Sequence, residues 1–161
     1  MKKKSLKLLL EYLKDSKRSD KEIARTLGVS QPTITRRRQR LVKEGWIKDF
    51  TVIPDFVEMG YEIMAIILFK LEVTKASIEK ATKGTMARPN IIFTSSAEGM
   101  GRNGVMISLH KSYTDFTNFL LDLRLEGGDG MQDFDTMLIS LKGRIIKPLS
   151  LAYLAEQKET L

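Results

Sequence analysis

A run of cationic side chains between residues 31 and 44 carries the chemistry with which this sequence could act on another molecule. Arginine can bind guanine O6 and N7 with two hydrogen bonds, and glutamine can pair in the same way with adenine. Cations that do not reach a base edge would bind backbone phosphates and fix the register. A solvated helix face is the alternative interpretation. The residues assigned to DNA contact are Ser30, Gln31, Thr33, Thr35, Arg36, Arg37, Arg40 and Lys43.

Two short helices joined by a tight turn are predicted to position these side chains. Ser19 can accept a hydrogen bond from an orphan backbone N–H, and Glu22 can complete a capping box with it. Gly28 supplies the positive φ favoured at a helix C-terminus. Ser30 can cap a second helix over residues 31–44. The arrangement is the helix-turn-helix pattern.

The second of these helices contains one residue that does not fit the pattern. With Ile34 and Leu41 on the core side of a helical wheel, Arg38 lies about 40° from Ile34. An aliphatic residue would fit that position better. The guanidinium could extend along the helix into water or reach a phosphate, and the sequence leaves both open.

Composition limits the remaining possibilities. The chain has 161 residues, a net charge of +7, no cysteine and a single histidine. The first 50 residues carry a net charge of +9 and the rest −2, which indicates a basic nucleic-acid module joined to a near-neutral domain. Without cysteine, thiolate catalysis is excluded, and neither a metal nor a cofactor is expected. Charges at Lys7, Glu11 and Lys14 interrupt the first apolar stretch, so we expect no signal peptide, no membrane span and a cytoplasmic location.

The spacing of apolar residues predicts the organisation of the chain. A first helix over residues 4–13 should pack on the helix-turn-helix through Leu6, Leu9, Leu10 and Leu13. Alternation over residues 47–53 predicts a strand that would form a wing, with Trp46 as a core plug beneath it. The expected division is a winged helix-turn-helix domain (1–54), a linker (55–60), a second domain (61–145) and a C-terminal tail (146–161).

The second domain is predicted to have the βαββαβ order of a ferredoxin-like fold, which makes the chain an α+β protein. Strands are expected over residues 62–73, 91–99, 104–110 and 134–143, helices over 77–86 (capped by Ser77) and 114–127, and a Gly-rich turn over 100–104. Both helices of this fold cover one sheet face. Apolar Met64, Ile66 and Leu68 on the other face therefore need a partner, most simply a second copy of the sheet. The expected homodimer would match a palindromic site on double-stranded DNA.

The whole layout resembles the Lrp/AsnC family of bacterial and archaeal transcription regulators. The resemblance rests on KEIARTLGVSQPTITRRRQRLVKEGWIKDFTVIPD, residues 21–55, and on the βαββαβ domain that follows. It covers residues 5–142 and implies a sequence-specific transcriptional regulator, expected to be archaeal. It also implies a dimer built on the second domain, assembling into tetramers or octamers, and control by an amino acid or related small-molecule effector.

Two features depart from this family. Arg38 stands where the family usually has an aliphatic residue. The family's effector loop usually carries a Gly, an aromatic residue and an Asp in a row, and this chain has neither the aromatic residue nor the aspartate there. Arg102 and Asn103 could instead bind a ligand bearing a carboxylate, whereas a Gly-rich hairpin without a ligand is the alternative. The candidate effector-binding residues are Glu98, Gly99, Gly101, Arg102, Asn103 and Gly104.

Other functions remain open at this stage. An architectural protein could coat DNA without sequence preference, and strong salt dependence would identify it. Some proteins of this fold resemble haem-precursor decarboxylases, but His110 is the one histidine, so no enzyme is expected. The acidic group Asp129, Asp133 and Asp135 lacks the spacing of a calcium loop, so we interpret it as a solvated loop.

Overall fold

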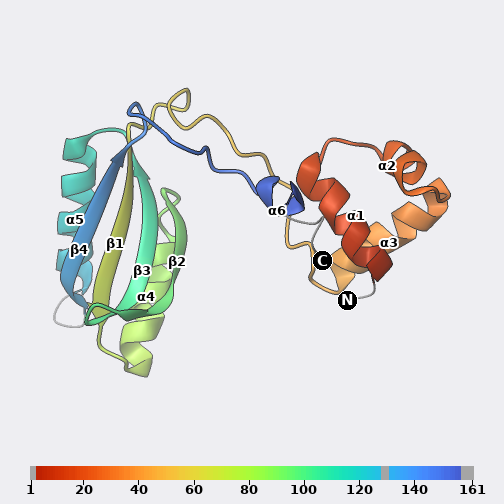
Figure 1. Cartoon of the computed structure of the whole chain (residues 1–161). Helices are drawn as coiled ribbons and strands as arrows, with labels where there is room; N and C mark the ends of the chain where they lie inside the picture. The colour runs from red at the N-terminus through yellow and green to blue at the C-terminus, as the bar shows by residue number, and fades with distance from the viewer. Residues whose placement is uncertain (1–2, 128–130, 157–161) are drawn as a thin grey trace. The chain divides into compact units, whose positions relative to one another are not determined.

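The computed structural model describes residues 3–127 and 131–156, and the chain separates into two compact units. The first unit comprises residues 1–53 and 147–161, and the second comprises residues 54–146. The first contains helices, whereas the second contains a four-stranded sheet and two helices (Figure 1). Among the described residues, no helix is long and apolar enough to cross a membrane.

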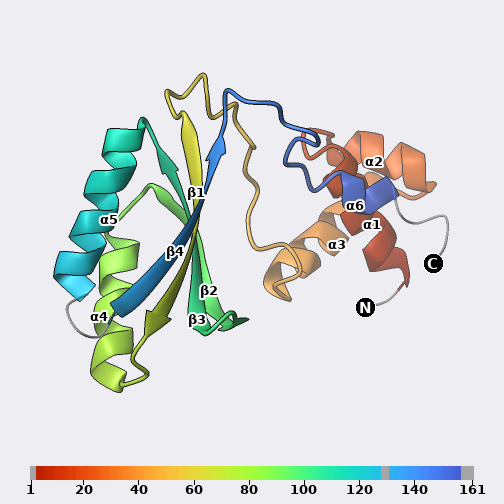
Figure 2. The ribbon, with the colours of Figure 1, turned by 60° about the vertical axis from the view of Figure 1, so that its left-hand side comes forward.

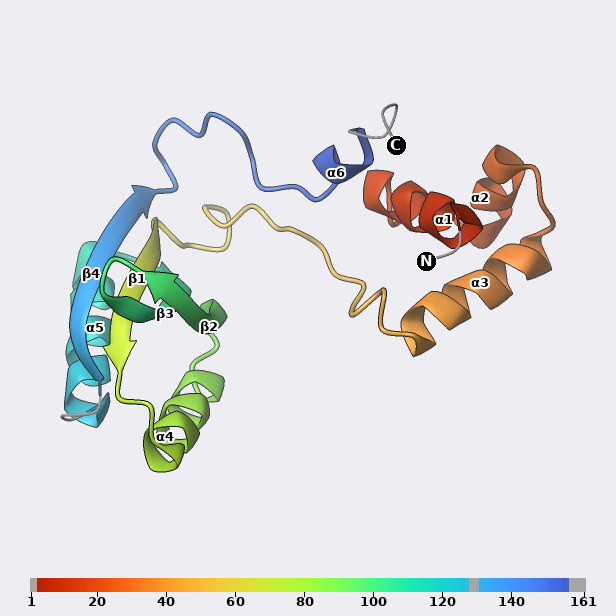
Figure 3. The same cartoon turned by 60° about the horizontal axis from the view of Figure 1, so that its bottom comes forward.

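A three-helix core builds the first unit (Figure 3). Its helices are α1 (Lys3–Lys14), α2 (Asp20–Leu27), α3 (Gln31–Lys43) and a short α6 (Tyr153–Glu156), which packs on α1. Ile23 and Ile34 are fully buried at the centre, so the predicted pairing of two short helices is confirmed. The turn is also confirmed, because the N–H of Gly28, at φ +64°, donates to carbonyls of α2.

The buried side of α1 differs from the predicted one. The predicted stripe of Leu6, Leu9, Leu10 and Leu13 is half-buried, whereas Leu8 and Tyr12 are the buried apolar positions. The stripe was predicted wrongly because α2, α3 and α6 all contact α1 and cover more than one of its sides. The prediction from apolar spacing also leaves out Tyr12, because its hydroxyl is polar.

The segment after α3 is extended, but it forms no strand. Residues 47–53 have no ladder hydrogen bonds, because no second strand accompanies them in the described part of the first unit. The described residues of the first unit therefore contain no strand over 47–53, where the wing strand is predicted. The predicted plug is wrong: Trp46 is 49% exposed, and Ile47, at 8%, enters the core in its place. The ring of Phe50 meets Tyr12 edge-on at 5.9 Å.

The second unit confirms the βαββαβ prediction. Its elements are β1 (Ile63–Leu71), α4 (Lys75–Met86), β2 (Ile91–Gly99), β3 (Arg102–His110), α5 (Tyr113–Gly127) and β4 (Met131–Ser140). The strands run in the order β2-β3-β1-β4, and every neighbouring pair is antiparallel. Both helices lie on the same face of the sheet (Figure 2).

Three local boundaries differ from the predicted ones. Thr74 caps α4 by accepting from the N–H of Ser77, which was the predicted cap. Strand β3 begins at Arg102, so the predicted turn over 100–104 shrinks to a tight connection. Strand β4 begins three residues before the predicted Phe134. The predicted end of the second helix at Gly127 agrees with α5, whereas residues 128–130 lie outside the described residues.

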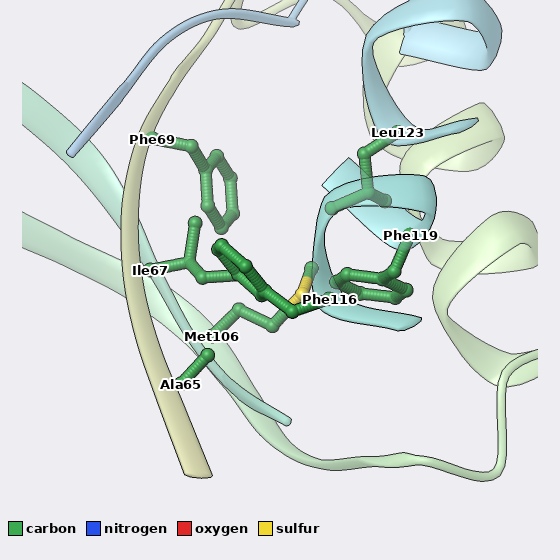
Figure 4. Packing of buried hydrophobic residues seen from close by; sticks show 7 residues of the cluster. All are labelled: Ala65, Ile67, Phe69, Met106, Phe116, Phe119 and Leu123. Carbon is green, nitrogen blue, oxygen red and sulfur yellow. The ribbon is translucent and has the colours of Figure 1, made fainter. Parts of the chain in front are cut away.

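Only one of the two helices seals the sheet. Phe116, Phe119 and Leu123 of α5 are buried against Ile67 and Met106 of the strands (Figure 4). Helix α4 contributes no buried residue. The half of the sheet beneath α4 therefore remains accessible.

Candidate nucleic-acid interface

Helix α3 separates an apolar side from a cationic side. Ile34 and Leu41 are buried in the core, whereas Arg36, Arg40 and Lys43 are exposed. These three project about 200° around the helix from Ile34. Helix α3 therefore has a buried apolar side and an exposed cationic side, and contact of the cationic side with DNA stays a prediction.

The contacts of the cationic residues leave most of their charge available. Arg40 Nε lies 2.5 Å from Glu44 Oε1, and Arg36 Nε donates to the Pro32 carbonyl at 3.4 Å. Within the described part of the chain, Arg36, Arg37 and Lys43 form no ion pair. A polyanion approaching this face would meet unneutralised cations.

The polar residues at the start of α3 are held in place by local bonds. Ser30 is the N-cap, and its Oγ lies 2.8 Å from Thr33 Oγ1. Gln31, the first helical residue, is exposed. Before α2, Ser19 and Glu22 form the predicted capping box, which orders the preceding turn. Ser30, Gln31 and Thr33 therefore lie together at the N-terminus of α3.

Arg38 takes neither of the two predicted paths. Its Nε and Nη2 each donate at 3.1 Å to the Asp20 carboxylate, at the first residue of α2. The same carboxylate accepts from the Tyr12 hydroxyl and from Thr35 Oγ1, both at 2.8 Å. Thr35, predicted to contact DNA, is thus held against α2. The position of Arg38 on the core side is explained by its pairing with Asp20, eighteen residues earlier in the chain. A helical wheel of α3 alone could not reveal this partner.

The electrostatics of this cluster favour its charged form. The hydrogen bond from Arg38 is the main reason why the pKa of Asp20 is lowered. The same bond raises the pKa of Arg38. Burial, followed by the bond to Asp20, raises the pKa of the Tyr12 hydroxyl, which therefore stays a donor at neutral pH. We call Tyr12, Asp20, Thr35 and Arg38 the Asp20 cluster.

The candidate effector residues lie at different places along the hairpin between β2 and β3. The side-chain amide of Asn103 accepts a hydrogen bond from the Leu71 N–H and donates one to the Leu71 C=O, both at 2.7 Å. Arg102 Nε lies 2.9 Å from Asp135 Oδ2. Gly99 ends β2 and Gly101 lies in the turn, and both have positive φ. Glu98 and Gly104 lie on the strands before and after it.

A cavity of about 680 Å³ lies between α4 and the sheet. Its walls are mainly apolar, and Glu98, Asn103 and Gly104 of the candidate effector residues line it. The ring of Phe69 forms part of the wall above Gly104, where a Cβ would come within 2.3 Å of it. No arginine or lysine is among the lining residues.

His110 is enclosed in the core of the second unit. Its side chain is fully buried, with Nε2 at 2.8 Å from Ser108 Oγ and the Phe119 ring at 4.9 Å. Burial lowers the pKa of His110, although Asp115, 3.7 Å from Nδ1, opposes the shift. His110 is therefore a core residue of the second unit, enclosed by the rings of α5.

The acidic group does not form the predicted solvated loop. Asp133 and Asp135 lie in β4, where Arg102 reaches both carboxylates. Asp129 lies outside the described residues. In the part of the chain that the structure describes, no group of three acidic, histidine or cysteine side chains could hold a metal.

The sheet face opposite the helices carries an apolar row. Register places Phe93, Ile107, Ile66 and Met137 side by side across all four strands. Phe93 is 51% and Met137 64% exposed. Nothing within the described second unit covers this row, because α4 and α5 occupy the other face.

Comparisons with known proteins were made for sequence and for fold. A family model described as winged helix-turn-helix DNA-binding matches residues 1–48. An uncharacterized HTH-type transcriptional regulator of Pyrococcus furiosus is 31% identical over 135 residues, covering 83% of this chain and 88% of that protein. HTH-type transcriptional regulator FL11 of P. furiosus is 31% identical over 134 residues, covering 83% and 85%.

Solved structures share the fold at lower identity. A Neisseria meningitidis transcriptional regulator in complex with L-Met has a TM-score of 0.78 at 17% identity, covering 96% of this chain and 99% of that one. B. subtilis LrpC has a TM-score of 0.77 at 21% identity, covering 92% and 99%. E. coli AsnC has a TM-score of 0.74 at 17% identity, covering 92% and 97%. The chain has a helix-turn-helix and a βαββαβ unit, and it matches HTH-type regulators over most of their length. It therefore belongs to the Lrp/AsnC family of DNA-binding transcription regulators.

Proposed function

We propose that this regulator reads a specific DNA sequence by inserting α3 into the major groove. The observation that carries the proposal is the exposed face of Arg36, Arg40 and Lys43, opposite the buried Ile34. Gln31 and Thr33 at the N-terminus of α3 would meet base edges, and the cations would bind bases or phosphates. Arg37 flanks this face, and Ser30 would donate at the helix N-terminus, where anions are favoured. Thr35 would contribute indirectly, because its hydroxyl is bonded to Asp20 on the core side of α3.

The functional form that we propose is a homodimer paired through the apolar row of the sheet. Two flat sheets that bury Phe93, Ile66 and Met137 against each other would remove exposed apolar area from water. A two-fold axis then relates two copies of α3, which suits a palindromic site. Assembly into tetramers or octamers would need a second interface on each chain, in addition to the apolar row of the sheet. Binding to chromosomal DNA also accounts for the expected cytoplasmic location.

A small molecule is the proposed control of DNA binding. The Neisseria relative is a complex with L-Met, and this chain has a cavity between α4 and the sheet. Glu98, Asn103 and Gly104 line it, while Gly99, Gly101 and Arg102 form the adjoining hairpin. Because no cation lines the cavity, an apolar group of the effector fits there better than a carboxylate. Saturation transfer NMR with L-methionine and L-glutamate tests this preference, and tighter binding of glutamate would contradict it.

The central test is a fluorescence-anisotropy titration of the DNA upstream of the gene against a shuffled duplex at two salt concentrations. We expect the upstream DNA to be preferred, and the preference to survive the higher salt. Equal binding to both duplexes, lost together in salt, would favour the architectural alternative. No binding to either would refute the assignment of α3.

A further inference from the structure

We propose that the Asp20 carboxylate is a positioning group that orients α3 for DNA, and that Arg38 acts through Asp20 rather than on the DNA. The inference rests on the proposed function, because it names what orients the helix that would read the site. It concerns residues that lie off the exposed cationic face of α3.

The Asp20 cluster joins α1, α2 and α3 of the first unit at one point. Tyr12 comes from α1, Asp20 from the start of α2, and Thr35 and Arg38 from the middle of α3. Four donor contacts of 2.8–3.1 Å converge on the two oxygens of a side chain that is 15% exposed. A carboxylate accepts about four hydrogen bonds, so its capacity is filled.

Three of these contacts come from two residues of α3 and restrain the rotation of the helix about its own axis. Thr35 and Arg38 are three residues apart and flank the core stripe on one side. The buried apolar residues of α3, Ile34 and Leu41, resist separation from the core but are non-directional. Hydrogen bonds with defined geometry are directional, and the bidentate arginine is the most restrictive kind. A turn of α3 about its axis would carry Arg36 and Arg40 away from the groove.

The contacts of Arg38 also separate it from the groove-facing arginines. Its Nε and Nη2 both donate to Asp20, and its side chain is 35% exposed. Arg36, two residues earlier, lies on the opposite face and forms no ion pair in the part of the chain that the structure describes. The two arginines therefore form a matched pair for experiment, with the same side chain on the same helix.

The test compares Arg38→Met and Asp20→Asn with the control Arg36→Met. Each full-length variant is titrated with upstream and shuffled DNA across a salt series. Arg36→Met should lower the slope of log K against log salt by about one, as expected for a lost phosphate contact. Arg38→Met and Asp20→Asn should keep the parental slope while the preference for upstream DNA falls about tenfold.

A double variant checks that the two residues act as a unit. Asp20→Asn with Arg38→Met should lose no more preference than either single change, because each already breaks the same pair. If Asp20→Asn does not fold, Thr35→Val removes a single donor and should lower the preference about threefold with an unchanged slope.

The outcomes separate this inference from the proposed function. A slope that falls for Arg38→Met as it does for Arg36→Met would place Arg38 on a phosphate and overturn the inference. If both variants keep the parental preference for upstream DNA, the Asp20 cluster only stabilises the fold and the inference is overturned. A parent without any preference refutes the proposed function instead. Amide hydrogen exchange then tests the restraint without DNA, because unchanged exchange along α3 in both variants refutes it.

Discussion

At the scale of single residues, the charges of α3 divide according to what they contact. Arg38 is paired inward with Asp20, whereas Arg40 is paired outward with the exposed Glu44. An exposed pair of this kind contributes little to stability, on the order of 0.5 kcal/mol. Its role is better judged by its effect on an approaching phosphate than by its effect on folding.

Glu44 should weaken DNA binding by neutralising part of the contact face. Glu44→Gln removes the negative charge next to Arg40, so affinity should rise about threefold at low salt, and the gain should shrink as salt screens it. Arg40→Ala should lower affinity by about tenfold without a change in melting temperature. Anisotropy titration and thermal unfolding measure both. Lys75→Ala on α4, also exposed, is the control, and equal losses for it and Arg40→Ala would argue against a specific face.

His110 should make the second unit less stable in acid. Burial lowers its pKa in the folded chain, so below the usual value of about 6.5 the unfolded chain binds more protons. The free energy of unfolding should therefore be level above about pH 7.5 and fall as pH drops through 6.5, by up to about 1.4 kcal/mol per pH unit. Urea unfolding at pH 7.5 and 5.5 measures the fall.

The control for this pH dependence is His110→Leu. This variant should be less stable at both pH values, because Ser108 loses its partner, but its stability should change less between them. The carboxylate of Asp115 is common to both proteins. A variant with the parental pH dependence would show that another group is responsible.

At the scale of elements, the two helices of the second unit show what amphipathic patterning can and cannot fix. The apolar stripe of α5 is strong enough to bury three large side chains, and the helix seals its half of the sheet. Helix α4 lines the space above β2 and β3 with Ile78, Ala81, Thr82, Thr85 and Met86, none of which is buried. These side chains do not fill the space, so a cavity remains.

Gly104 should be indispensable to the packing of β1 against β3. A Cβ at this position would lie 2.3 Å from the ring of Phe69, which is buried in the core. Gly104→Ala should therefore lower the free energy of unfolding by about 1–3 kcal/mol. Denaturant unfolding measures the loss. Ser96→Ala, on the strand residue paired with Gly104, should be nearly neutral because Ser96 is exposed. Equal stability of the glycine variant would mean that Phe69 can move aside freely.

At the scale of the whole molecule, the open face of the sheet is the feature that a single chain leaves incomplete. Four apolar residues in register form one row, and isolated chains rarely leave such a row in water. Pairing with an identical face is the simplest solution, since one surface then satisfies both copies.

Ile66→Asp should break the proposed dimer and weaken DNA binding with it. The carboxylate would lie at the centre of the paired faces, where burial of an unpaired charge is strongly unfavourable. Light scattering gives the mass, and anisotropy gives the affinity. Leu121→Asp on the outer side of α5 is the control, because Leu121 is 52% exposed on the helical layer. A dimer that survives Ile66→Asp but not Leu121→Asp would place the interface on the helices.

The helix-turn-helix, its caps, the βαββαβ order and the cationic face of α3 could be predicted from the amino-acid sequence. Each of these depends on residues within one element or one turn, where periodicity and capping chemistry act. The partner of Arg38, the exposure of Trp46 and the absence of a strand over 47–53 could not be predicted, because each depends on residues distant in sequence. A strand needs a neighbour, a buried charge needs a counter-charge, and neither can be located from local spacing alone.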